Sequence, residues 1–155
     1  MAIAVELSGA PLPEGARAAI DAVVAALLAS NFGDLPDGQV NICLTDDAEL
    51  QRLNAQFAES DYPTDVLSFS YIENGASPID GTLGDVAISL DMAGRQALAA
   101  ETPLTTELAL LSLHGILHVL GYDHIEMSER KRMDQIQAGL MADAGLIYRD
   151  FAWVS

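Results

Sequence analysis

The histidines constrain this chain more than any other feature, because all three lie within eleven residues, between His114 and His124. His114 and His118 are four residues apart, so they share one face of a helix. The residues before them, 108–113, are apolar with one exception, which predicts that this helix is buried at the centre of the fold. Gly121 follows where a helix can end through a left-handed residue, and the chain can turn there to return His124 towards the other two imidazoles.

Three neutral imidazoles that converge from a helix and the following turn leave a tetrahedral zinc ion one open position, as a hydrolytic metal requires. A lone buried histidine is more often a core residue, and two at helical spacing can arise by chance. Three at this spacing are difficult to explain by packing, because every buried ring needs polar partners. We therefore expect one zinc ion per chain, bound by His114, His118 and His124, although imidazole also suits nickel, copper and iron.

The spacing of the histidines matches the zinc-protease pattern H-E-x-x-H-x-x-G-x-x-H, with one informative difference. In the proteases a glutamate follows the first histidine and serves as the general base, whereas here that position is Gly115. Glycine cannot accept a proton. The segment therefore predicts a metal scaffold like that of a protease, without the protease base.

Composition restricts the function classes further. The chain carries 23 acidic residues against 7 lysines and arginines, for a net charge of −16, which opposes non-specific binding to nucleic acid or anionic membranes. An RNA partner has to be recognised locally, and we expect no DNA or membrane partner. Residues 1–10 lack the features of a signal peptide, and no apolar run is long enough to cross a bilayer. With Cys43 as the single cysteine, expected to be buried in a strand, these features predict a cytoplasmic protein.

Hydrophobic periodicity predicts a single α+β domain over residues 1–155, with about four strands in a mixed sheet and about five helices. The expected strands cover 2–7, 39–44, 66–71 and 84–90. The expected helices cover 14–30, 46–57, 91–100, 102–120 and 128–144, with Ser128 as the cap of the last one. The fourth helix is the buried histidine helix.

Two polar residues in the predicted strands are candidate catalytic groups. Asp85 is a candidate proton acceptor or water-orienting group, and an acid at a solvated strand edge is an equally good interpretation. Strand alternation would place Ser68 on the opposite face from Leu67 and Phe69, where its hydroxyl contacts substrate or bonds to backbone.

Other polar residues carry weaker hypotheses. Glu107 lies on nearly the same helix face as His114, and Asp123 adjoins His124, so either carboxylate could accept the free N–H of a ligating histidine. Asp123 is equally well explained as a turn residue. The basic cluster 130–132 (Arg-Lys-Arg) could meet a phosphate, but three adjacent charges on a helix are more typical of a solvated face.

With these residues identified, the chain resembles the YbeY family of bacterial rRNA-maturation endoribonucleases. The blocks that carry the resemblance follow one another in family order, and the overall length also fits. They are Leu53-Asn54, Pro63-Thr64-Asp65-Val66-Leu67-Ser68-Phe69, Gly84-Asp85-Val86-Ala87-Ile88-Ser89 and the histidine block 114–124. The histidine block is highly specific, whereas the block that begins at Gly84 would be weak alone.

The resemblance implies a zinc ion held by the three histidines in a fold similar to zincin catalytic domains. It implies cleavage of single-stranded RNA, processing of the 3′ end of small-subunit rRNA, and a part in ribosome quality control with the small subunit or its proteins as partners. The family usually carries an arginine before the Pro-Thr block, and here Ala58 stands at that position. Because a guanidinium pairs well with phosphate oxygens, its loss predicts weaker RNA binding.

Three functions remain open on the sequence. The leading one is a metal-dependent endoribonuclease, in which either water or the adjacent 2′-hydroxyl attacks the phosphodiester. The second is a small metalloprotease, against which Gly115 argues. The third is a non-enzymatic, ribosome-associated module with a structural metal, which Ala58 and the acidic composition favour.

Overall fold

The computed structural model describes residues 3–30, 35–57, 65–122 and 127–148. Within these residues the chain forms four strands, five α-helices and one short 3-10 helix. The strands are β1 (Ile3–Gly9), β2 (Gly38–Thr45), β3 (Val66–Ser70) and β4 (Thr82–Ser89). The helices are α1 (Ala16–Ala29), α2 (Asp47–Phe57), η1 (Glu73–Gly75), α3 (Leu90–Ala100), α4 (Leu104–Val119) and α5 (Met127–Asp143).

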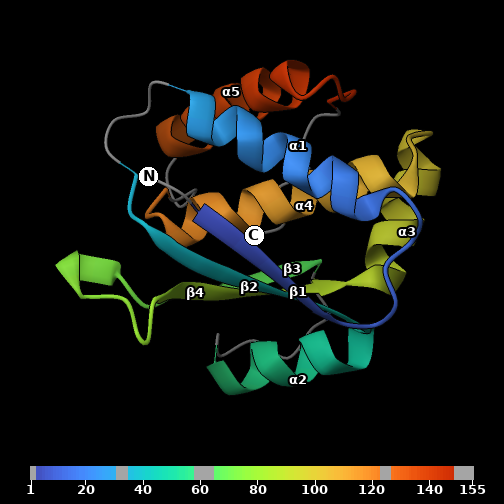
Figure 1. The fold of residues 1–155 in the computed structure, drawn as a ribbon. Helices are drawn as coiled ribbons and strands as arrows, with labels where there is room; N and C mark the ends of the chain where they lie inside the picture. The colour runs from blue at the N-terminus through green and yellow to red at the C-terminus, as the bar shows by residue number, and fades with distance from the viewer. Residues whose placement is uncertain (1–2, 31–34, 58–64, 123–126, 149–155) are drawn as a thin grey trace.

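The strands form one mixed sheet in the order β1-β2-β4-β3. The pairs β1–β2 and β2–β4 are parallel, and β3 adds to β4 in the antiparallel sense. The predicted fold class, a mixed four-stranded α+β sheet with five helices, is therefore confirmed. α2 lies on one side of the sheet, whereas α1, α4 and α5 lie on the other (Figure 1).

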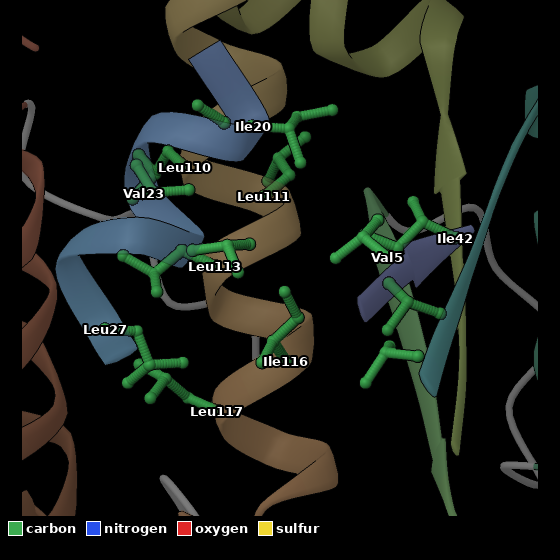
Figure 2. Close-up of a cluster of buried hydrophobic side chains, with 14 of the residues drawn as sticks. Val5, Ile20, Val23, Leu27, Ile42, Leu110, Leu111, Leu113, Ile116 and Leu117 are labelled. Carbon is green, nitrogen blue, oxygen red and sulfur yellow. The ribbon is translucent and has the colours of Figure 1, made fainter. Parts of the chain in front are cut away.

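The histidine helix α4 lies at the centre of the fold, between the sheet and α1 (Figures 1 and 2). All but three of its sixteen residues are buried, because apolar side chains surround the helix on nearly every side. Figure 2 shows two sets of contacting side chains. Leu110, Leu113 and Leu117 face Ile20, Val23 and Leu27 of α1, and Leu111 and Ile116 face Val5 and Ile42 of the sheet. The predicted central, buried position of this helix is confirmed.

Local capping groups explain where several elements begin and end. The Asp46 carboxylate accepts a hydrogen bond from the Glu49 backbone N–H at 2.9 Å, which starts α2 as predicted. Gly121 follows α4 with a φ of 104°, in the left-handed region that favours glycine. The prediction for Ser128 was wrong, because α5 already begins at Met127 and Ser128 lies inside it.

Cys43 is half-buried, so the prediction that it is a buried core residue was wrong. Its neighbours Ile42 and Leu44 point to the α4 side of β2 and are almost completely buried. Strand alternation therefore places Cys43 on the opposite face, which α2 covers only in part. None of the helices in the described residues has both the length and the apolar character needed to cross a bilayer.

Candidate metal centre

His114 and His118 project from the C-terminal half of α4, and their Nε2 atoms lie 3.2 Å apart. The two ring centroids are separated by 4.7 Å, with an angle of 74° between the ring planes. His114 is 4% exposed, whereas His118 is half-buried. The spacing of four residues thus directs one nitrogen of each ring to the same point.

Gln137 of α5 contacts the nitrogen of His114 that faces away from His118. The Nδ1 atom of His114 lies 2.7 Å from Oε1 of Gln137, a side chain with no exposed surface. An amide oxygen only accepts hydrogen bonds, so this contact requires the ring proton on Nδ1. In that tautomer Nε2 keeps its lone pair on the side of His118.

This pair of nitrogens fits a zinc ion. Two nitrogens that are each about 2.0–2.1 Å from a tetrahedral ion lie about 3.3–3.4 Å apart. The separation of 3.2 Å between the two Nε2 atoms is close to that geometry. Within the described part of the chain, no cluster of three His, Cys, Asp or Glu residues is placed to hold a metal. The third predicted ligand, His124, lies outside the described residues, so the three-histidine site stays a prediction.

The position of the protease glutamate has no room for a side chain. An ideal Cβ built on Gly115 would lie 2.5 Å from Cγ1 of Val86 and 3.3 Å from Oγ of Ser68. The sheet therefore approaches α4 so closely at Gly115 that a side chain there would require Val86 to shift. Gly115 is needed for packing, in addition to lacking a group that could accept a proton.

Ser68 lies on the α4 side of β3, next to the histidine helix. Its hydroxyl donates a hydrogen bond to the carbonyl oxygen of Gly115 at 3.2 Å, and the Ser70 hydroxyl donates to the carbonyl oxygen of Val119 at 2.7 Å. Of the two interpretations offered by the sequence, this geometry corresponds to the bond to backbone. Both serines attach the edge strand to the helix that carries the histidines.

Asp85 lies on the other face of the sheet. Ser68 and Val86 are register partners on the face that contacts α4, so Asp85, the next residue along β4, points towards α2. Its carboxylate accepts hydrogen bonds from the Asn41 amide, at 2.9 Å, and from the Tyr71 hydroxyl. The structure does not bring Asp85 to the histidine pair.

The surroundings of Asp85 form a groove of about 570 Å³ between α2 and the sheet. Apolar side chains of α2 and β3, among them Leu53, Phe57 and Phe69, form its walls. The hydrogen bond to Asp85, together with partial burial, raises the pKa of Tyr71 to about 12. Tyr71 therefore remains a neutral hydrogen-bond donor at physiological pH.

The remaining candidate residues lie on α4, on α5 or outside the described residues. Glu107 is buried in α4, but the acceptor found for the His114 Nδ1–H is Gln137. Lys131 and Arg132 of the basic cluster are exposed on α5, and Arg130 is half-buried. Asp123 and Ala58 lie outside the described residues.

Sequence reasoning missed Gln137, although the sequence contains a signal for it. In α5 the residues Met133, Ile136, Leu140 and Met141 form the buried face, and Gln137 is the polar residue in the middle of them. A fully buried amide at such a position has to find hydrogen-bond partners in the core. The sequence does not say which ones, because the partner lies on another helix.

Comparison with known proteins extends the resemblance seen in the motifs. The family described as Endoribonuclease YbeY matches residues 10–145. A relative named Endoribonuclease YbeY from Syntrophotalea carbinolica is 42% identical over 117 residues, which cover 72% of this chain and 77% of the relative. Relatives of the same name from Azorhizobium caulinodans and Bacillus licheniformis are 37% and 34% identical, and each alignment covers 87% of this chain. These alignments cover 85% and 89% of the two relatives.

The fold is also similar to a solved structure. The solution structure of protein TM1509 from Thermotoga maritima superposes with a TM-score of 0.56, covers 90% of both chains and is 22% identical in sequence. At that identity the likeness concerns the fold alone. The family match, by contrast, includes the histidine helix, β3 and β4, whose motifs carried the resemblance in the sequence. By motifs, by family match and by its relatives, the chain belongs to the Endoribonuclease YbeY family.

Proposed function

We propose that this chain is a zinc-dependent endoribonuclease that cleaves single-stranded RNA in the maturation of the 3′ end of small-subunit rRNA. The observation that supports the metal centre most directly is the 3.2 Å separation of the His114 and His118 Nε2 atoms, with the His114 Nδ1 atom 2.7 Å from Gln137 Oε1. The relatives named Endoribonuclease YbeY support the choice of RNA as substrate.

His114, His118 and His124 are the proposed metal ligands. A zinc ion, when bound, supplies Lewis-acid chemistry at a phosphoryl oxygen and makes water more acidic. The sheet closes one side of the histidine pair at Gly115, and half-buried His118 is the more accessible of the two rings. We therefore propose that RNA approaches from the side of His118.

The catalytic roles of Asp85 and Ser68 stay predictions, and their positions lend them little support. Asp85 points to the far face of the sheet, and the Ser68 proton is used in the bond to the helix backbone. Asp85→Asn is expected to leave cleavage of free RNA within about twofold of wild type. A loss of cleavage at unchanged metal content would assign Asp85 a part in the reaction.

Family membership also supports the partners and the location. We propose that the small ribosomal subunit or its proteins bring this enzyme to its RNA substrate in the cytoplasm. A part in ribosome quality control is proposed on the same ground.

Peptide hydrolysis is the weaker alternative, because Gly115 offers no base and leaves no space for one. A non-enzymatic, metal-binding module is favoured by the net charge of −16 and by Ala58 in place of the arginine that the resemblance implies. The experiment below separates these functions.

The test compares wild type with His118→Ala for metal content and for cleavage of a single-stranded RNA that carries the 3′ end of precursor small-subunit rRNA. Wild type should contain about one zinc ion per chain and cleave this RNA, and a chelator should stop cleavage until zinc is restored. His118→Ala should contain little metal. A duplex RNA and an unstructured protein substrate serve as controls that should remain intact.

The other outcomes would contradict the metal site or indicate one of the alternative functions. Equal zinc content in wild type and His118→Ala would contradict the metal site. Zinc-loaded wild type that leaves every RNA intact would indicate the metal-binding module. Chelator-sensitive hydrolysis of the protein substrate would indicate a protease.

A further inference from the structure

We propose that Gln137 is a positioning residue for the metal centre. Its amide oxygen holds His114 in the tautomer that presents Nε2 to the ion. This inference rests on the metal site proposed above and adds a residue on a different helix. The contact that carries it is the 2.7 Å separation of His114 Nδ1 and Gln137 Oε1. Both side chains are buried, at 4% and 0% exposure, so water does not compete effectively for this hydrogen bond.

Two further contacts continue from the Gln137 amide towards Asp134. The Nε2 atom of Gln137 donates to the Tyr148 hydroxyl at 3.4 Å, and that hydroxyl donates to the Asp134 carboxylate at 3.4 Å. In this arrangement the amide nitrogen of Gln137 points to Tyr148 and its amide oxygen points to His114. The two outer contacts are long for hydrogen bonds, so they support this orientation less than the 2.7 Å contact with His114 does.

The consequence for His114 follows from the number of its ring protons. A neutral imidazole carries one proton, and the amide oxygen of Gln137 requires that proton on Nδ1. The other nitrogen then carries the lone pair that a metal ion needs. If the amide oxygen is removed, the buried Nδ1–H loses Gln137 as its hydrogen-bond acceptor. This loss favours either the tautomer with the proton on Nε2 or a rotated ring. Either change removes the ligand atom from the pair with His118.

The amide also performs this function without adding charge to the core. A carboxylate in the same place would orient the ring equally well, because it too accepts from Nδ1. It would, however, have to be desolvated in a position with no exposed surface. The neutral side chain avoids that penalty.

The first measurement uses the metal-free full chain and no variant. Nitrogen-15 NMR at about pH 8.5, where histidine is ordinarily neutral, distinguishes the protonated ring nitrogen from the bare one. The wild-type His114 ring should carry its proton on Nδ1. A proton on Nε2 of His114 would overturn the proposal, whether or not the protein binds zinc.

The second measurement compares Gln137→Leu with Gln137→Glu, and with Gln135→Leu as the matched control on the exposed side of the same helix. Gln137→Leu should lose the Nδ1–H tautomer and weaken zinc binding about 10- to 100-fold in competition with a chelator. Gln137→Glu should keep the Nδ1–H tautomer, because a carboxylate also accepts from Nδ1. Gln135→Leu should match wild type in both measurements.

These results separate the proposal from the proposed function. Gln137→Leu with an unchanged tautomer, or with an unchanged zinc affinity, would overturn the role of Gln137. If Gln137→Leu does not fold, the wild-type tautomer and the Gln137→Glu variant still decide the matter. A wild-type protein that binds no zinc would contradict the proposed function, while the spectrum would still report the orientation of His114.

Discussion

At the scale of single residues, Gly115 combines a requirement of packing with a consequence for chemistry. Its missing side chain lets β4 approach α4 until Val86 occupies the space that a Cβ would need. The same absence removes the base that zinc proteases use at this position. The sequence reveals which side chain is missing, but only the fold shows what occupies its place.

Gly115→Ala is expected to destabilise the protein in spite of the better helix propensity of alanine. The new methyl group would lie 2.5 Å from Val86 Cγ1, and overpacking of this kind typically costs about 1–3 kcal/mol. Gly139→Ala in α5 is the matched control, because no atom lies within 4 Å of its ideal Cβ. That variant should gain about 0.5–1 kcal/mol from helix propensity alone. Urea denaturation of both variants measures the difference, and equal gains in stability would contradict the close contact at Gly115.

At the scale of elements, the edge strand β3 is attached on two sides. It pairs with β4 through the sheet, and Ser68 and Ser70 bond to the carbonyl oxygens of Gly115 and Val119 in α4. The distance between the two serines matches the distance between the two carbonyl groups. Two residues along a strand span about 6.6 Å, and four residues along a helix span about 6.0 Å. The position of β3 therefore depends on the helix that carries the histidines.

Replacing both serines by alanine should loosen β3 more than the rest of the sheet. Each neutral hydrogen bond of this type contributes about 0.5–1.5 kcal/mol. Hydrogen exchange of the β3 amides should therefore accelerate in the double variant Ser68→Ala/Ser70→Ala, while β1 and β2 keep their protection. Ser8→Ala, on β1, serves as the control. Equal acceleration in every strand would show that the serines support global stability and not the attachment of β3.

The elements were predictable from the sequence to within a few residues, because hydrophobic periodicity is a local property. The helix that carries His114 and His118 is recognisable in this way, and so is its burial. The direction of Asp85 was not predictable, since it depends on which face of the sheet α4 covers. Gln137 was missed for a related reason: its partner lies on another helix, and no local pattern connects the two.

At the scale of the whole molecule, charge is the property that most affects an RNA substrate. A net charge of −16 repels a polyanion at a distance, so binding has to come from short-range contacts. The arginine that the resemblance implies at position 58 would be one such contact, and this chain has Ala58 instead. Wild-type RNA binding is therefore expected to be weak and sensitive to salt.

Ala58→Arg should strengthen binding of single-stranded RNA, since a charge-assisted hydrogen bond contributes about 1.5–3 kcal/mol. The slope of log affinity against log salt should steepen by about 0.7, the value for one phosphate contact on a single strand. Binding and cleavage are measured at several salt concentrations after the metal content of both proteins has been matched. Ala58→Lys separates charge from the paired hydrogen bonds of a guanidinium. An unchanged affinity in Ala58→Arg would direct attention to the basic cluster 130–132 as the phosphate contact.

The central position of α4 has a consequence for how the protein is synthesised. The apolar faces of α1 and of the sheet both pack against a helix that begins only at Leu104, in the last third of the chain. A nascent chain that stops before this helix exposes those faces, and exposed apolar surface promotes aggregation and degradation. The helix that completes the core also carries His114 and His118. A chain that ends before Leu104 lacks both the helix that completes the core and these two histidines, so we expect it to be degraded and not to accumulate as a folded fragment.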